Sequence, residues 1–332
     1  MAENKKYEIT VLLAQYNPDY KKIEATLHSI LIQKKVNFEI IICDDGSTNN
    51  CFEQIELYFK KWNFQNYKLV CLKQNAGTVK NLIHGAKEAT GEYIKLISPG
   101  DYLYDENTLR EICNFMNKQK AKIAFGNVVK FENAGQSIIR HTERMPRNIK
   151  IYHKKHYAYC KILKNMLLYW DWIVGASLIY ERTQFLQLIN EIDGKVKFVE
   201  DLITFIAIAD KQKIFHFDRY VVWYEYGTGV STSQNNFWAE QIAKDKDAIY
   251  ELLYQRYPDN RVIKSAYLNN KNRLEKNKIK KVFQTILICP GKLWYLLVSR
   301  LKRSFQKEND DVKLEWLQAY LGEGEKNFVL RR

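Results

Sequence analysis

Groups of polar residues follow apolar stretches at four places in the first hundred residues. They are Gln15-Tyr16-Asn17, Asp44-Asp45-Gly46-Ser47-Thr48, Asn75-Ala76-Gly77 and Ser98-Pro99-Gly100-Asp101. Carboxylates in such turns can accept hydrogen bonds or ligate a hard cation. An unpaired acid facing a crevice is costly, so Asp44 and Asp45 predict a bound partner. The alternative is an ordinary turn with a helix N-cap, because Asp, Gly and Ser are favoured there on local grounds.

The elements that carry these turns alternate regularly between strand and helix. Apolar, β-prone runs cover residues 9–14, 38–43, 68–72 and 93–97, and apolar residues at helical spacing lie between them. This alternation predicts an α/β fold with a parallel sheet wrapped by helices. In such sheets, ligands bind at the carboxyl ends of the strands, which is where all four polar groups lie.

Several motifs of other enzyme classes are missing from the sequence. There is no G-x-G-x-x-G and no G-x-x-x-x-G-K-[ST], which disfavours a Rossmann dinucleotide fold and a P-loop NTPase. The sequence also has no H-E-x-x-H and no paired Cys and His spacing, so we expect no zinc site.

Composition indicates a globular chain with an anionic partner. The 332 residues are 46% hydrophobic, which is enough for a sizeable core and about two domains. The 52 Lys and Arg against 38 Asp and Glu give a net charge of +14. The six cysteines form no C-x-x-C pair, so we expect a reduced, cytosolic protein. Neither a secretory signal nor a spanning apolar stretch is apparent.

The positive charge is concentrated towards the C-terminus. Residues 261–307 contain thirteen basic residues and one acid, Glu275, and their apolar residues fall at helical spacing on both sides of Pro290-Gly291. This pattern predicts two basic amphipathic helices. We expect residues 276–307 to bind an anionic membrane surface. The alternatives are that the apolar stripe packs on the protein's own core, or that the charge binds nucleic acid. We expect no nucleic acid partner, because no recognised motif accompanies the charge.

With these blocks in order, the chain resembles the family-two inverting glycosyltransferases of the bacterial surface-polysaccharide type. The resemblance is carried by ITVLLAQYN from Ile9, EIIICDDGSTNN from Glu39, QNAGTVKNLIHGAKEATGEYIKLI from Gln74, and VED from Val199. It implies a GT-A fold over residues 1–230, with a nucleotide-binding half (1–110) and an acceptor half (111–230). Residues 231–332 are then a helical C-terminal region.

The resemblance also implies a site for a nucleotide-sugar donor. In such enzymes the first strand-end loop and the acid of the second bind the nucleobase, which maps to Ala14 and Tyr16 for ring contacts. Asp45, with Asp44 as its neighbour, maps to a hydrogen bond with a uracil-type edge, so we predict a UDP-linked donor. Lys80 occupies a place where the family commonly has a basic residue that contacts base or phosphate.

The chain departs from the family at the metal site. Members usually carry a D-x-D whose last Asp ligates the Mn²⁺ or Mg²⁺ that bridges the diphosphate, whereas this chain has Ser98 and Gly100 at the acidic positions. Either Asp101, one residue later, binds the metal, or protein cations neutralise the diphosphate, or the metal site and catalysis are lost. We predict the first, with Ser98 in the donor site. The late loop that closes over the phosphates keeps Ser231 but has Glu225 in place of the usual Arg.

Glu200-Asp201 resembles the family's catalytic pair. Inversion requires a carboxylate that takes the proton of the acceptor hydroxyl opposite the leaving diphosphate. We assign this general base to Asp201, with Glu200 orienting the acceptor or the base. Acids are also favoured in the first turn of a helix, such as the one expected after Asp201. Trp170-Asp171-Trp172 is a candidate platform for an acceptor sugar, or a piece of the core.

The sequence therefore predicts a hexosyltransferase of polysaccharide biosynthesis in the cell envelope. It would transfer a sugar from a UDP-linked donor to a glycan or lipid-linked glycan, while bound peripherally at the cytoplasmic face of the cell membrane. The alternative is a catalytically silent sugar-nucleotide-binding scaffold for another transferase, which the missing D-x-D suggests.

Overall fold

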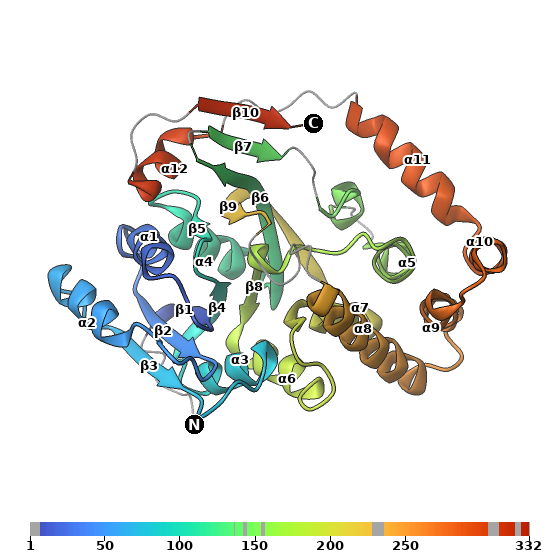
Figure 1. Cartoon of the computed structure of the whole chain (residues 1–332), viewed down its shortest axis with the longest axis horizontal. Coiled ribbons are helices and arrows are strands. Elements are labelled where there is room, and N and C mark those ends of the chain that lie inside the picture. The colour runs from blue at the N-terminus through green and yellow to red at the C-terminus, as the bar shows by residue number, and fades with distance from the viewer. Residues whose placement is uncertain are drawn as a thin grey trace.

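A computed structural model describes residues 7–135, 137–141, 145–153, 157–227, 236–304, 312–322 and 327–331. Its centre is a ten-stranded mixed sheet with the order β10-β7-β6-β8-β4-β1-β2-β3, and β9 pairs with β6 and β5 (Figure 1). The strands are β1 (Tyr7–Gln15), β2 (Phe38–Asp44), β3 (Tyr67–Cys71), β4 (Gly91–Ile97), β5 (Tyr102–Leu103), β6 (Ile123–Ala134), β7 (Ser137–His141), β8 (Leu178–Glu181), β9 (Ile214–Glu225) and β10 (Asn327–Arg331).

The first four strands are parallel neighbours, as the sequence predicted. In the central strand β1, Ile9 lies opposite Phe38 of β2 and Tyr93 of β4. Every residue of β2 is buried, which matches the β-branched run in its middle. Because the strands run in the same direction, their carboxyl ends, with Gln15, Asp44 and Ile97, meet at one edge of the sheet.

Helices cover both faces of the sheet. They are α1 (Tyr20–Leu31), α2 (Phe52–Lys61), α3 (Thr78–Lys87), α4 (Thr108–Gln119), α5 (Tyr159–Tyr169), α6 (Arg182–Glu191), α7 (Ile203–Ala209), α8 (Asn236–Arg256), α9 (Arg261–Lys271), α10 (Lys278–Ile288), α11 (Gly291–Ser304) and α12 (Leu314–Leu321). One core layer joins α1, α2 and α4 to the sheet, and the opposite layer joins α3 and α5 to α9 (Figure 1). The fold is thus a helix–sheet–helix sandwich.

The second half of the sheet is mixed. β8 is antiparallel to both β4 and β6, and β6 runs antiparallel to β7 but parallel to β9. This arrangement brings the end of β9, at Glu225, to the turn that follows β4. The long-range pairing of β5 with β9, with Tyr102 opposite Trp223, fixes this approach.

The C-terminal region forms two amphipathic helices, which pack against α9 and α5 at the side of the protein, and a segment that returns to the sheet. The predicted helices on each side of Pro290-Gly291 are present as α10 and α11. α8 and α9 instead pack into the same core as the sheet. α12 packs against α1, and β10 pairs with β7, neither of which the sequence predicted. Within the described ranges, no helix is long and apolar enough to cross a membrane.

Candidate active site

Asp44 closes the turn that follows β2. Its carboxylate accepts hydrogen bonds from Gln15 Nε2 at 3.1 Å, from the Ser47 N–H at 2.7 Å and from Ser47 Oγ at 2.6 Å. The residue is fully buried. For Asp44, the structure therefore shows the hydrogen-bonded turn that was one of the two alternatives in the sequence. A direct contact of Asp44 with the sugar-nucleotide donor remains a prediction.

Asp45 holds the turn that begins α3. Its Oδ1 accepts the N–H of Ala76 at 2.7 Å, and its Oδ2 accepts the N–H of Gly77 at 2.9 Å. Burial raises the pKa of Asp45, while these N–H groups and Lys197 oppose the shift. Gly77 has φ +95, and a Cβ there would lie 2.6 Å from the carbonyl oxygen of Lys197. Sequence reasoning missed Lys197, a cation at the strand-end edge from a distant part of the chain.

The other predicted donor residues lie around the same edge. Ala14 faces Cys43 at the end of β1, and the Tyr16 side chain beyond it is 50% exposed. Lys80 is exposed in the first turn of α3, and Ser98 is exposed directly after β4. Tyr16, Lys80 and Ser98 are therefore accessible, as contacts with a donor require. Ser231 lies outside the described residues.

The turn from Ser98 to Asp101 is packed against the end of β9. Gly100 has φ +96, and a Cβ there would lie 2.4 Å from Glu225 Oε2. The Glu225 carboxylate also forms an ion pair with Lys22 Nζ at 2.5 Å. The backbone N–H of Glu225 donates a hydrogen bond to Asp101 Oδ1 at 3.2 Å. The Glu225 carboxylate thus lies where a side chain at position 100 would point.

The side chains at this turn do not fit a divalent cation. Asp101 is buried, and burial raises its pKa to about 7. The ammonium groups of Lys95 and Lys22 both lie near Asp101. The Lys95 ammonium is buried and donates hydrogen bonds to the Leu96 and Ala176 carbonyls. Two ammonium groups oppose a dication, and in the described part of the chain no three His, Cys, Asp or Glu side chains are grouped as metal ligands. The prediction that Asp101 binds metal gains no support from this geometry.

Glu200 and Asp201 form a short 3₁₀ helix that leads into α7. Burial raises the pKa of both carboxyl groups; repulsion by Asp201 adds to the shift at Glu200, while Lys246 lowers the pKa of Asp201. A Cβ at Gly175 would lie 3.2 Å from Glu200 Oε1 and 3.4 Å from Asp201 Oδ2. The small residue keeps the backbone before β8 close to both acids. The arrangement is that of a desolvated carboxylate pair, which can accept a proton near neutral pH.

Helix α8 positions this acid pair. Asp245 is buried and accepts the N–H groups of Lys197, Phe198 and Val199 at 2.9, 2.7 and 3.0 Å, which fixes the segment before Glu200. The next residue, Lys246, is the cation that interacts with Asp201. Sequence reasoning missed both, because the run Lys244-Asp245-Lys246-Asp247 has the composition of a solvated helix surface.

The tryptophan pair before β8, Trp170 and Trp172, has lysine ammonium groups against its rings, which stacking of a sugar does not require. Asp171 is buried and accepts hydrogen bonds from Tyr295 Oη at 2.5 Å and from the backbone N–H of Arg147 and Asn148. Lys246 Nζ lies 4.4 Å from the centre of the Trp172 ring and Lys292 Nζ lies 4.3 Å from that of Trp170. Stacking of a sugar on these rings remains a prediction.

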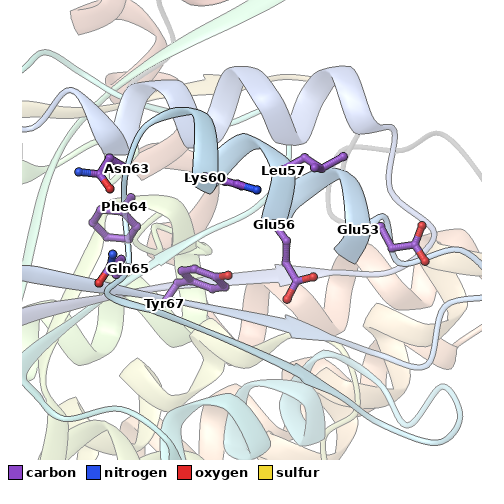
Figure 2. A pocket seen from close by; sticks show the side chains of 8 residues that line it. All are labelled: Glu53, Glu56, Leu57, Lys60, Asn63, Phe64, Gln65 and Tyr67. Carbon is purple, nitrogen blue, oxygen red and sulfur yellow. The ribbon is translucent and has the colours of Figure 1, made fainter.

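A separate surface hollow lies beside α2, away from the strand-end turns. It is lined by Glu53, Glu56, Leu57, Lys60, Asn63, Phe64, Gln65 and Tyr67 (Figure 2). Tyr67 begins β3 and pairs with Ile40 near the start of β2. The hollow is therefore near the amino ends of the strands, the opposite end from Asp44 and Asp45.

Comparison with known proteins agrees with this arrangement. Residues 10–171 match the model of glycosyl transferase family 2. These residues form a family 2 glycosyl transferase domain. The match contains all four strand-end turns and ends at Asp171, so the Glu200-Asp201 pair lies beyond it.

Two curated relatives are similar to about a third of the chain. UDP-Glc:alpha-D-GlcNAc-diphosphoundecaprenol beta-1,3-glucosyltransferase WfaP of Escherichia coli is 30% identical over 123 residues, which are 36% of this chain and 45% of WfaP. Poly-beta-1,6-N-acetyl-D-glucosamine synthase of Staphylococcus aureus (strain COL) is 33% identical over 119 residues, which are 36% of this chain and 28% of the synthase. The matched segment therefore spans less than half the length of either relative.

Solved structures confirm the predicted fold. S. aureus TarS 1–349, in complex with UDP-GlcNAc, superimposes with a TM-score of 0.56 at 16% identity over 85% of this chain and 79% of TarS. The same protein in complex with UDP gives a TM-score of 0.56 over 95% of this chain and 92% of TarS. The chain thus has the GT-A fold.

Proposed function

We propose that the protein is an inverting glycosyltransferase that transfers a hexose from a UDP-linked donor to a glycan or lipid-linked glycan. The observation that carries the proposal is the desolvated Glu200-Asp201 pair, which α8 holds through Asp245 and Lys246. The family 2 match of residues 10–171 supports glycosyl transfer. No observation favours the silent scaffold over an enzyme.

In the proposed reaction, Asp201 is the general base. The acceptor oxygen forms a bond to the anomeric carbon while the bond from that carbon to the diphosphate oxygen breaks and UDP leaves. The proton of the acceptor hydroxyl passes to Asp201, and Glu200 orients the hydroxyl. Burial keeps the pKa of Asp201 above that of a free aspartate, which makes it a better proton acceptor, and Lys246 keeps it ionised.

A uridine nucleotide suits the strand-end residues. TarS has been solved with UDP and with UDP-GlcNAc, and in this chain Tyr16 offers an exposed ring at the strand-end edge of the sheet. The Asp45 carboxylate has about four acceptor positions, and the N–H groups of Ala76 and Gly77 take three of them. We propose that the fourth accepts the ring N–H of uracil.

We further propose that protein cations, and not a bound metal, neutralise the leaving diphosphate. Glu225 fills the space beside Gly100 and pairs with Lys22. Lys197, close to Gly77, adds a second cation at the same edge of the sheet.

The basic helices would hold the enzyme at an anionic membrane. Helix α10 has no buried residue, and Ile279, Phe283 and Leu287 are 83%, 61% and 66% exposed. On α11, Trp294 is 71% exposed. Both helices lie at one side of the molecule, away from the sheet (Figure 1). An exposed apolar stripe with flanking lysines is the pattern of an interfacial helix, so we propose a peripheral location at the cytoplasmic face of the cell membrane.

The experiment that tests the function is a calorimetric titration of UDP, once with Mn²⁺ and once with a chelator, followed by an assay of UDP release from UDP-hexoses. The proposal expects UDP to bind with similar affinity in both conditions and at least one UDP-hexose to be turned over. Metal-dependent binding would overturn the role of the protein cations. Failure to bind UDP would overturn the donor, and binding without turnover of any UDP-hexose would favour the scaffold.

A further inference from the structure

Two ammonium groups lie on the same indole ring beside the proposed base. Lys246 Nζ is 5.3 Å and Lys292 Nζ is 4.3 Å from the centre of the Trp170 ring. Lys246 also contacts the ring of Trp172 and interacts with Asp201. Partial burial lowers the pKa of both lysines, because it removes water from the charged form.

Neither ammonium forms an ion pair with an acid of the described residues. Among the described residues, no carboxylate lies within ion-pair distance of Lys246 or Lys292, whereas Lys271 and Lys280 of the same region pair with Glu251 and Glu275. The charge of Asp201 raises the pKa of Lys246 and so opposes the effect of burial. The two partly desolvated cations outnumber the one acid, Asp201, whose charge acts on Lys246, so the group carries net positive charge and favours an anion.

The site is built by elements that are far apart in sequence. Trp170 has φ +53, an uncommon backbone conformation for a tryptophan, and the Asp171 N–H bonded to the Asn165 carbonyl holds it there. Tyr295 of α11 stacks on Tyr169 and donates to Asp171. Helix α11 is thereby fixed against the turn, so the position of Lys292 is defined.

The site also links the proposed base to one of the proposed membrane helices. Lys246 is on α8, next to Asp201, whereas Lys292 is in the first turn of α11, and Trp294 of the same helix is exposed. An acceptor that reaches Asp201 from the membrane would pass these two lysines.

We propose that Lys246, Lys292 and Trp170 bind a phosphate or diphosphate that is part of the acceptor, adjacent to the sugar that receives the new residue. This inference rests on the proposed function, because it assigns a substrate class to the same site. The ammonium groups would pair with phosphate oxygens, and the edge of Trp170 would contact the neighbouring sugar. The acceptor would then be a sugar phosphate, and in its lipid-linked form the phosphate would join sugar and lipid.

The test compares two probes by ligand-observed NMR, with UDP present at saturation so that the donor site is occupied. The probes are N-acetylglucosamine 1-phosphate and N-acetylglucosamine. The proposal expects the phosphate form to bind at least about tenfold more tightly, since a charge-assisted contact has roughly this value. Lys292→Gln and Lys246→Gln should each remove most of this difference, and neither should change binding of UDP. Lys278→Gln, an exposed lysine in the first turn of α10, is the matched control.

Equal affinity for the two probes, or an unchanged preference in Lys292→Gln, would overturn the proposal. A second arm measures sedimentation with phosphatidylglycerol vesicles. If Lys292→Gln weakens vesicle binding more than Lys278→Gln does and leaves the probe preference intact, Lys292 binds lipid headgroups and the proposal is wrong. If the unsubstituted protein does not bind UDP, the proposed function is contradicted instead. The same probe comparison without UDP would still report on the lysine site.

Discussion

Asp201 combines a position at the start of a helix with an environment that suits proton transfer. Acids are favoured in a first helical turn, so its presence before α7 is explained locally. Its desolvation and its electrostatic interaction with Lys246 have no such local explanation, because Lys246 is on a separate helix. At the residue scale, the proposed chemistry therefore depends on a balance between burial and one cation.

Replacing Asp201 with Asn should remove the base and keep the shape of the side chain. We expect Asp201→Asn to lower kcat by at least about a hundredfold, since general base catalysis contributes this much or more. Binding of UDP should be unchanged. Asp193→Asn, an exposed acid before the same segment, is the control. Equal loss in both variants, or retained turnover in Asp201→Asn, would contradict the assignment.

The pH profile tests the balance directly. A protonated Asp201 cannot accept a proton, so kcat/KM should fall as the pH drops through its pKa, which burial places above that of a free aspartate. Lys246→Met removes the cation that favours the ionised form, so the acidic limb should move to higher pH by about one unit. Lys244→Met, exposed on α8, should leave the limb in place. An unmoved limb in Lys246→Met would show that Lys246 does not act on the base.

At the scale of elements, the turns after the strands are held by residues that reach across from other parts of the chain. Asp45 after β2 bonds the turn before α3, and Lys197, in the segment that leads to Glu200, packs on Gly77 of that turn. The Val79 N–H donates to the Lys197 carbonyl at 3.1 Å. The donor turn and the segment of the proposed base are therefore one packed unit.

Gly77→Ala should strain this unit. The residue has φ +95, and the new Cβ would lie 2.6 Å from the Lys197 carbonyl oxygen. We expect the free energy of unfolding to decrease by about 2–3 kcal/mol, and UDP binding to weaken, because the turn must move. Gly194→Ala has a comparable φ of +72 with nothing within 4 Å, so it should lose about 1 kcal/mol and bind UDP normally. Denaturant unfolding and UDP titration of both variants provide the check. Similar losses in the two variants would show that the contact with Lys197 is unimportant.

At the scale of the whole molecule, the C-terminal region contributes one helix to the core and exposes another on the surface. Ile263 and Ala266 of α9 are buried in the same core as the sheet, whereas the apolar stripe of α10 is exposed. A truncation after residue 260 would therefore remove part of the core along with the membrane helices. Substitutions on the exposed stripe separate the two effects.

The double variant Phe283→Ser and Leu287→Ser should weaken binding to phosphatidylglycerol vesicles by at least about tenfold, since each side chain buries apolar area in the bilayer interface. Both side chains are more than half exposed, so thermal stability should be unchanged. Leu57→Ser on α2, 67% exposed, is the control for an apolar residue outside the basic helices. Vesicle sedimentation is the measurement, and unchanged binding of the double variant would contradict a membrane role for this stripe.

The sequence by itself determined the first four strands, the helices between them and the break at Pro290-Gly291, because hydrophobic periodicity and turn residues act over a few positions. It also determined the family that residues 10–171 match, since the strand-end turns are contiguous stretches.

Tertiary structure decided which charges meet. The pairing of Glu225 with Lys22, the approach of Lys197 to the donor turn, the bonds from Asp245 and the pairing of β10 with β7 each join distant segments. Such contacts depend on how whole helices and strands pack, and Lys22, Lys197 and Lys246 have no local pattern that distinguishes them from the other lysines of a basic chain.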